Sequence, residues 1–195
     1  MRICVFASGK GSNFSAILKA IDEKKLSSQV VAFVTNKPGC GAELIAKDRE
    51  IKTFHFNSSD LITSLKNLNV DFIVLAGFLK KLDENFINSF ENKIINIHPA
   101  LLPSYGGAGM YGMNIHKEVI RNKEKYSGIT IHFVNENYDE GKIIFQKKVD
   151  IEEGDDESTL VEKIHRLEHE SYPWAIKKFE EDKVKIINDK VEILN

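Results

Sequence analysis

The first half of the chain alternates short apolar runs with stretches of helical periodicity. Strands are predicted where several consecutive positions are apolar, at residues 2–7, 29–35, 53–56, 71–76 and 93–97. Helices are predicted where apolar residues recur every three or four positions, at residues 13–24, 41–49, 60–68 and 82–90. Ser58 or Ser59 is the expected cap of the third helix. This alternation predicts right-handed βαβ crossovers and a mostly parallel sheet covered by helices on both faces.

The second half follows a different pattern. A helix at residues 115–122 precedes two β-like runs, 128–134 and 142–149, which a polar turn separates. A long helix from 158 to about 181 follows, and a hairpin is expected around Asn188 and Asp189. The long helix should face the core with its apolar residues, Leu160, Ile164, Leu167, Tyr172 and Trp174.

These patterns predict an α/β fold with a doubly wound, Rossmann-like, mostly parallel sheet and an antiparallel C-terminal part. Since no repeat, low-complexity tract or linker interrupts the chain, residues 1–195 are predicted to form a single domain. Ligands of open parallel sheets bind beyond the carboxyl ends of the strands. That rule selects four loops, which are expected to converge on one cleft: residues 8–13, 77–82, 96–112 and 135–141.

The loop Ser8-Gly9-Lys10-Gly11-Ser12-Asn13 joins the first strand to the first helix. Glycines allow close approach of the backbone, and free N–H groups at a helix start favour an anion. Ser12 or Asn13 can instead simply cap the helix. The loop is therefore either a phosphate site or a tight turn with a polar cap.

Asn96 and His98 lie two residues apart at the end of a predicted strand, so they point to the same side of it. An amide and an imidazole so placed can converge on one carbonyl oxygen, the amide as a donor and the imidazole as a donor or general acid. The alternative is a strand-end histidine satisfied by backbone groups. Pro99 and Pro103 favour the first interpretation because they stiffen the following loop.

Other polar residues are weaker candidates. Asp139, in a polar turn, can orient an imidazole and raise its pKa, or it can be an ordinary exposed aspartate. His165 and His169 have the spacing of metal ligands on a helix, but no third ligand is evident and no metal site is predicted.

Composition excludes several classes of protein. The 195 residues are 42% hydrophobic and 29% charged, with a formal net charge of −2. This charge balance lacks the surplus of Lys and Arg that nucleic-acid binding requires. The apolar runs are too short to span a membrane. Cys4 and Cys40, the two cysteines, are expected to be reduced and structural. A cytoplasmic protein is therefore predicted.

In order and spacing, six motifs resemble the folate-dependent formyltransferases, most closely those that act on glycinamide ribonucleotide. The motifs are residues 8–13 (SGKGSN), 75–79 (LAGFL), 96–103 (NIHPALLP), 128–134 (GITIHFV), 139–141 (DEG) and 143–146 (IIFQ). The resemblance implies formyl transfer from 10-formyltetrahydrofolate, as co-substrate, to the amine of the ribonucleotide in purine biosynthesis. It implies small-molecule partners, a monomer or homodimer, and no metal.

The resemblance also assigns residues to roles. The implied catalytic trio is Asn96, His98 and Asp139. The ribonucleotide phosphate and ribose would contact Gly11, Ser12, Asn13 and Glu168. Folate would contact Leu79, Lys80, Lys81, Leu82, Asn96, Val134, Asn135, Glu136, Asn137, Tyr138 and Asp139. In the implied mechanism, Asn96 and a protonated His98 stabilise negative charge on the formyl oxygen, and Asp139 raises the pKa of His98.

Two segments depart from the family pattern. The stretch from Ser104 to Met113 is longer and richer in Gly than expected, which leaves the role of Gly106 to Gly112 open. No basic residue between Phe56 and Leu61 is available for the folate glutamate tail, a contact that Lys80 or Lys81 could supply instead.

Three rival functions are compatible with parts of this pattern. Methionyl-tRNA formyltransferase and formyltetrahydrofolate hydrolase share the Asn/His/Asp site but normally add a second domain, which is not expected here. A non-catalytic nucleotide-binding module is the third rival, and it predicts that Asn96, His98 and Asp139 do not converge.

Overall fold

A seven-stranded sheet organises the protein, described here from a computed structural model that covers residues 1–194. The strands are β1 (Arg2–Phe6), β2 (Gln29–Thr35), β3 (Thr53–His55), β4 (Phe72–Leu75), β5 (Ile94–His98), β6 (Tyr126–Phe133) and β7 (Ile143–Asp150). Their order is β3-β2-β1-β4-β5-β6-β7. The first five are parallel, whereas β6 and β7 are antiparallel to their neighbours. The α/β sheet and its antiparallel part confirm the predicted fold class.

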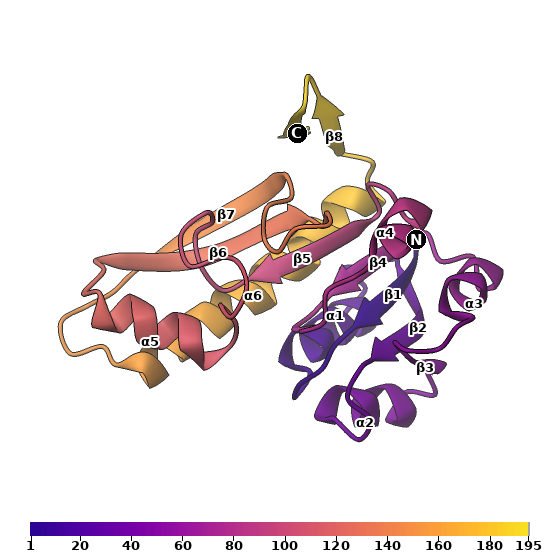
Figure 1. Cartoon of the computed structure of the whole chain (residues 1–195), viewed down its shortest axis with the longest axis horizontal. Coiled ribbons are helices and arrows are strands. Elements are labelled where there is room, and N and C mark those ends of the chain that lie inside the picture. Colours follow the sequence, from indigo (N-terminus) through magenta and orange to yellow (C-terminus); the bar gives the residue numbers. More distant parts are fainter. Residues whose placement is uncertain (195) are drawn as a thin grey trace.

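In the described residues, 1–194, six helices connect the strands: α1 (Ser12–Asp22), α2 (Gly41–Asp48), α3 (Leu61–Asn67), α4 (Glu84–Ser89), α5 (Met113–Arg121) and α6 (Glu157–Glu180). Helices α1, α2, α5 and α6 share one buried cluster with one face of the sheet, and α3 and α4 share a second cluster with the other (Figure 1). On β1, Ile3 and Val5 belong to the first cluster and Cys4 and Phe6 to the second. The alternation of a strand between two apolar faces explains why this run is apolar throughout.

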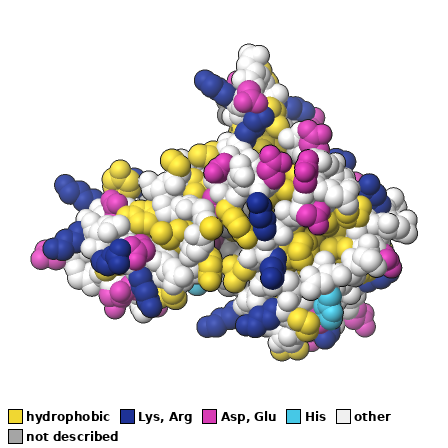
Figure 2. Space-filling view, in the orientation of Figure 1, with side chains coloured by type: hydrophobic (Ala, Val, Ile, Leu, Met, Phe, Trp, Pro, Cys, Tyr) yellow, Lys and Arg dark blue, Asp and Glu magenta, His cyan; other side chains and the backbone are white. Residues whose placement is uncertain are grey.

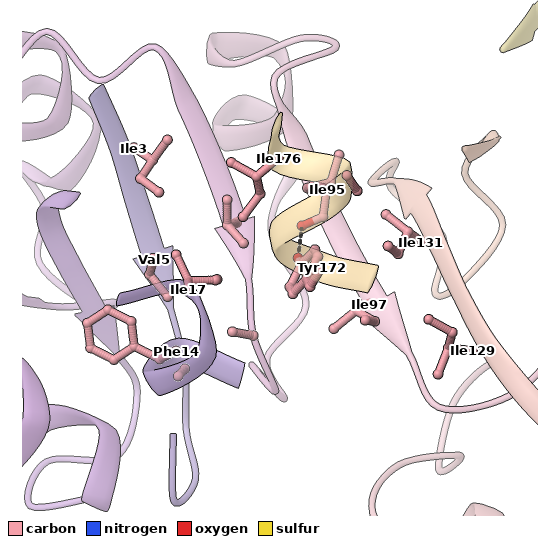
Figure 3. Close-up of a cluster of buried hydrophobic side chains, with 14 of the residues drawn as sticks. Ile3, Val5, Phe14, Ile17, Ile95, Ile97, Ile129, Ile131, Tyr172 and Ile176 are labelled. Atoms are coloured by element: carbon pink, nitrogen blue, oxygen red, sulfur yellow. Dashed lines mark hydrogen bonds between the residues drawn. The ribbon is translucent and has the colours of Figure 1, made fainter. Parts of the chain in front are cut away.

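Helix α6 is held to the sheet by a tyrosine. The Tyr172 side chain is fully buried, and its hydroxyl lies 2.7 Å from the Leu75 carbonyl oxygen and 3.2 Å from that of Ile95. Figure 3 shows Ile95 and Ile97 of β5 and Ile129 and Ile131 of β6 directed toward the same cluster. The hydroxyl is therefore satisfied inside an otherwise apolar contact.

The C-terminal hairpin is confirmed. Strands β8 (Val184–Ile187) and β9 (Lys190–Ile193) pair antiparallel, and the hairpin stands out from the body of the molecule (Figure 1). Asn188 and Asp189 have φ angles of 47° and 65°. Two consecutive residues with positive φ are typical of the tightest hairpin turn, which favours Asn and Asp.

Two details of the predicted helices are wrong. The third helix begins after Asp60, and neither Ser58 nor Ser59 caps it, since the Ser59 hydroxyl donates to the Asp60 carboxylate. Trp174 does not face the core: it is 37% exposed, and its ring packs on Phe145 with 4.6 Å between ring centres. Phe145 lies on β7, the edge strand of the sheet, so Trp174 packs at that edge.

Charged side chains of both signs are mixed over the surface drawn in Figure 2. Cys4 and Cys40, expected to be reduced, are both free, and both are buried. None of the helices in residues 1–194 has both the length and the apolarity needed to cross a bilayer.

Candidate active site

Asn96 and His98 project from the same face of β5, as their spacing predicts. His98 is only 4% exposed, and its Nε2 donates a hydrogen bond of 2.8 Å to the Tyr105 carbonyl oxygen. The other ring nitrogen, Nδ1, is thus the one that faces neighbouring side chains. Tyr105 has a φ of 56°, and this left-handed residue turns the loop so that its carbonyl meets the histidine.

Asp139 faces two histidines at once. Its Oδ1 lies 3.5 Å from His98 Nδ1 and 3.6 Å from His132 Nε2, and only 10% of its side chain is exposed. The N–H of Gly107 donates to its other oxygen at 2.9 Å. Asp139 itself has a φ of 58°, a conformation that aspartate tolerates better than most residues. The carboxylate is therefore held in place rather than exposed in a turn.

The loop that bears Asp139 does not reach the site in the way the sequence suggests. Because β6 is antiparallel to β5, the loop after Phe133 begins beside Ile95, near the amino end of β5. The rule for parallel strands does not apply to it, and the loop must fold back over the sheet. The Gly107 N–H receives it there, which gives the Gly-rich stretch a structural role.

His132 lies opposite Asn96 in the β5–β6 ladder and is 2% exposed. Its Nε2 is 3.2 Å from Asn96 Nδ2, and its Nδ1 is 2.7 Å from the Phe133 carbonyl oxygen. The candidate centre therefore contains four polar side chains instead of the three predicted.

Thr130 holds the proline-bounded loop that follows His98. Its hydroxyl donates to the Ala100 carbonyl at 2.7 Å and accepts from the Leu102 N–H at 2.9 Å. Gln146 on β7 bonds both this hydroxyl and the Leu102 carbonyl at 2.9 Å. The loop is thus fixed by buried hydrogen bonds, which limits movement of His98.

Burial dominates the ionisation of His98. It lowers the pKa of His98 below the ordinary value of 6.5, and although Asp139 and the Tyr105 carbonyl raise it, the net direction is downward. Asp139 acts on the histidine in the expected direction, but the net lowering of the pKa of His98 favours a neutral imidazole in the free protein at neutral pH.

Asp139 remains ionised. Burial alone would raise the pKa of Asp139, but the polar contacts around the carboxylate, the Gly107 N–H among them, outweigh burial and hold the pKa below the ordinary value of 3.8. A neutral imidazole beside a fixed carboxylate can accept a proton and be stabilised as a cation.

The glycine loop after β1 lies against α2. Gly11 has a φ of 86°, and a Cβ there would meet Ala42 at 2.9 Å. Neither Ser12 nor Asn13 caps α1: the cap position is Gly11, with no side-chain hydrogen bond. Instead Asn13 is buried and its Nδ2 donates to Glu168 Oε2 at 3.0 Å, while its Oδ1 has no partner.

Glu168 is 5% exposed. Burial raises the pKa of Glu168 from 4.5 to about 7, and the hydrogen bond from Asn13 lowers it in part. A buried carboxyl and an unpartnered amide oxygen together present acceptors beside an exposed Ser12, an arrangement that suits a hydroxyl-bearing anion.

The two segments predicted to contact folate are neighbours in space. Lys81, Leu82 and Glu136 help to line a depression of about 420 Å³. Lys81 Nζ lies 5.9 Å from the centre of the Tyr138 ring. Leu79 is 52% exposed, and its N–H donates to Ser8 Oγ at 3.2 Å, which ties this segment to the glycine loop. Lys80 is exposed, as are Glu136 and Asn137, whereas Val134 and Asn135 are half-buried.

His165 and His169 stack on one face of α6 with 6.0 Å between ring centres. Within residues 1–194, no three side chains of the metal-binding types are grouped so as to hold an ion. The pair is not part of the centre formed by Asn96 and His98.

Sequence reasoning missed Gly107, Thr130, His132 and Gln146. The sequence offered a signal for two of them, since Thr130 and His132 alternate with the apolar residues of the run Ile129–Phe133 and so share one face of the strand. Gly107 and Gln146 gave no such signal, because their partners lie in distant segments.

Known proteins resemble the chain over most of its length. A sequence model of the formyl transferase family matches residues 1–176. The chloroplastic phosphoribosylglycinamide formyltransferase of Arabidopsis thaliana is 36% identical over 99% of this chain and 70% of its own length. The phosphoribosylglycinamide formyltransferase of Bacillus subtilis is 35% identical over 90% of this chain and 93% of its own. The crystal structure of glycinamide ribonucleotide transformylase 1 from Symbiobacterium toebii superposes with a TM-score of 0.90 at 31% identity, over 100% of this chain and 94% of that one.

Proposed function

The chain belongs to the formyl transferase family, and from this premise we propose that it transfers a formyl group from 10-formyltetrahydrofolate to the amine of glycinamide ribonucleotide. One observation carries the proposal: Asn96, His98 and Asp139, from two distant segments, meet in one buried centre. A non-catalytic module does not require that convergence. We further propose that the protein works as a single domain in the cytoplasm, without a metal, on these two small molecules.

The ribonucleotide is proposed to bind at the glycine loop. Gly11 and Ser12 offer backbone N–H groups at the start of α1 to the phosphate. The unpartnered oxygen of Asn13 and the buried carboxyl of Glu168 are acceptors for ribose hydroxyls. Both side chains would otherwise remain poorly satisfied inside the protein, which supports a polar ligand there.

Folate is proposed to bind between residues 79–82 and 134–139. The exposed Leu79 and Tyr138 offer apolar surface to a pterin, and Lys81 or Lys80 offers positive charge to the glutamate tail. Because the Leu79 N–H is bound to Ser8, this segment and the phosphate loop keep a fixed relation. Such an arrangement would hold the amine of the ribonucleotide close to the formyl carbon of the folate.

The proposed chemistry uses the centre at β5. The amine attacks the formyl carbon, and negative charge develops on the formyl oxygen. Asn96 donates a hydrogen bond to that oxygen. His98, neutral in the free protein, accepts the amine proton at Nδ1, and Asp139 stabilises the resulting imidazolium from 3.5 Å. The same proton is then available to the folate nitrogen as it leaves.

Release of tetrahydrofolate tests this function. We expect the protein to convert 10-formyltetrahydrofolate only when glycinamide ribonucleotide is present, with equimolar formylated product. Release without the ribonucleotide would indicate the hydrolase, and formylation of methionyl-tRNA would indicate the tRNA enzyme. No turnover with any acceptor would leave the nucleotide-binding module.

A further inference from the structure

Tyr105 has a backbone conformation that a tyrosine rarely adopts. Its φ angle is 56°, in the left-handed region, which glycine enters freely and a bulky residue enters only under strain. Glycines occupy the next two positions, Gly106 and Gly107, yet this turn is made by the tyrosine. A strained residue persists only where surrounding contacts hold it, and such residues cluster at functional sites. The contacts of the Tyr105 side chain therefore need an explanation.

The hydroxyl of Tyr105 is held by the turn that follows α5. It donates to Glu124 Oε1 at 2.7 Å and accepts from Asn122 Nδ2 at 3.1 Å. The bond to the carboxylate is charge-assisted, and both Tyr105 and Glu124 are half-buried. The turn itself is fixed, because the N–H groups of Asn122 and Lys123 bond back to α5 at 2.9 Å and 3.0 Å. The loop is thus anchored to an element outside the candidate centre.

The backbone around Tyr105 contacts both groups of the proposed proton transfer. The Tyr105 carbonyl accepts from His98 Nε2 at 2.8 Å, and two residues later the Gly107 N–H donates to Asp139 at 2.9 Å. A change in the backbone of this segment would therefore disturb the histidine and the aspartate together.

The Tyr105 carbonyl also decides where the proton of His98 lies. A neutral imidazole carries one proton, and two acceptors face this ring: the carbonyl at Nε2 and the Asp139 carboxylate, 3.5 Å from Nδ1. A proton on Nδ1 would leave no lone pair there to accept the amine proton. The bond to the carbonyl favours the proton on Nε2 and leaves Nδ1 free as the base.

We propose that Tyr105 is a positioning residue: its hydroxyl, held by Glu124 and Asn122, keeps residues 105–107 in the conformation that fixes the tautomer of His98. The proposal rests on the function proposed above. The side chain reaches away from the centre to its anchor, and the carbonyl of the same residue reaches into the centre.

Tyr105→Phe keeps the ring and removes both hydrogen bonds of the hydroxyl. Loss of a hydrogen bond to a charged group shifts an equilibrium by about 10- to 100-fold, which limits the effect on turnover. We expect kcat to fall about tenfold, with little change in KM for either substrate. Tyr126→Phe is the matched control, since Tyr126 is exposed on β6 and its ring lies 4.1 Å from Lys148 Nζ. A kcat of Tyr105→Phe within about twofold of the wild type would overturn the proposal.

The partner of the hydroxyl provides a test that leaves Tyr105 in place. Glu124→Ala removes the acceptor and should lower kcat as Tyr105→Phe does. Glu124→Gln keeps an acceptor oxygen there and should stay within about threefold of the wild type. The variant that combines Tyr105→Phe with Glu124→Ala should be no slower than either single variant, because all three lose the same contact. Multiplicative losses, or a Gln variant as slow as the Ala variant, would refute the positioning role.

Nitrogen-15 NMR of His98 reads the positioning role without turnover. The wild type should show a neutral ring protonated at Nε2. In folded Tyr105→Phe a population protonated at Nδ1 should appear, drawn by Asp139, whereas a loss of stability alone would leave the ring of the folded protein unchanged. A wild-type ring protonated at Nδ1, or the same ring state in both proteins, would contradict the proposal. Because no substrate is needed, failure of the proposed function is distinguishable from failure of the positioning role.

Discussion

Asn13 Nδ2 donates a hydrogen bond of 3.0 Å to Glu168 Oε2, joining two residues that are 155 positions apart in the chain. The contact links the start of α1 to α6 beneath the glycine loop. It also leaves the carboxyl of Glu168 buried without a cation, which is why its pKa rises to about 7.

Glu168→Gln should stabilise the protein at alkaline pH. The folded-state pKa of about 7 exceeds the ordinary 4.5, so the folded state binds the proton more tightly and loses stability as pH rises from about 4.5 through 7. The amide cannot ionise and escapes this loss. Between pH 5 and pH 8, the free energy of unfolding of the variant should gain about 2–3 kcal/mol on the wild type.

Urea unfolding of both proteins across this pH range measures the difference. Glu170→Gln is the matched control, since Glu170 lies on the same helix but is exposed and paired with Lys147. If the difference in the free energy of unfolding between the Glu168 variant and the wild type stays constant with pH, burial does not raise the pKa of Glu168. The same Glu168 variant should raise KM for the ribonucleotide.

Asn96→Ala should collapse turnover without unfolding the protein. Removal of an oxyanion donor typically costs about 2.7–4 kcal/mol of transition-state stabilisation, or about 10²- to 10³-fold in kcat. Asn96 is half-buried, so the fold should tolerate the change. Single-turnover kinetics with both substrates would check it, and an unchanged single-turnover rate constant would remove Asn96 from the chemistry.

His98→Ala should be at least as damaging, because the imidazole is both the proposed base and the partner of Asp139. The cavity it leaves beside Tyr105 should lower stability as well, so thermal unfolding is compared with that of the wild type. Near-wild-type product formation by a folded His98→Ala protein would exclude the proposed base.

The acid limb of the kcat/KM profile should report His98. Because the base must be neutral and its pKa lies below 6.5, kcat/KM should rise with pH through a value below 6.5 and then level off. In Asp139→Asn the carboxylate no longer raises the pKa of His98, so the limb should move to lower pH while kcat falls. A limb that moves upward would contradict this assignment; Asp189→Asn, an exposed aspartate paired with Lys142, is the control.

Gly141→Ala should damage both stability and activity. A Cβ at Gly141 would lie 1.7 Å from the Phe133 carbonyl oxygen, so the loop and the strand must separate. That carbonyl accepts from His132, and the loop bears Asp139, so both contacts should be lost. Overpacking of this kind costs about 1–3 kcal/mol.

Denaturant unfolding checks the cost, and Gly9→Ala serves as the stability control because nothing lies within 4 Å of a Cβ there. Equal stability of the two alanine variants would mean that the β6–β7 turn relaxes freely.

The local features of this fold could be predicted from sequence because they depend on spacing alone. Apolar runs predicted every strand of the sheet, and helical periodicity predicted every helix that connects them, since each element must bury one face. The two-residue spacing of Asn96 and His98 placed them on one side of β5 for the same reason. Asn188 and Asp189 marked the last turn because few other residues accept positive φ.

The composition of the centre depended on contacts between distant segments. The direction of β6 is the first reason. Because β6 runs antiparallel to β5, His132 lies opposite Asn96, and the loop that bears Asp139 folds back to the Gly107 N–H. Burial is the second reason. Its effect on the pKa of His98 exceeds the opposite effect of Asp139, which favours a neutral imidazole, and it raises the pKa of Glu168. The sequence by itself determined which residues each element could offer; the tertiary structure alone decided which of them meet and in which protonation state, because pairing register and desolvation are properties of the packed chain and not of any local pattern.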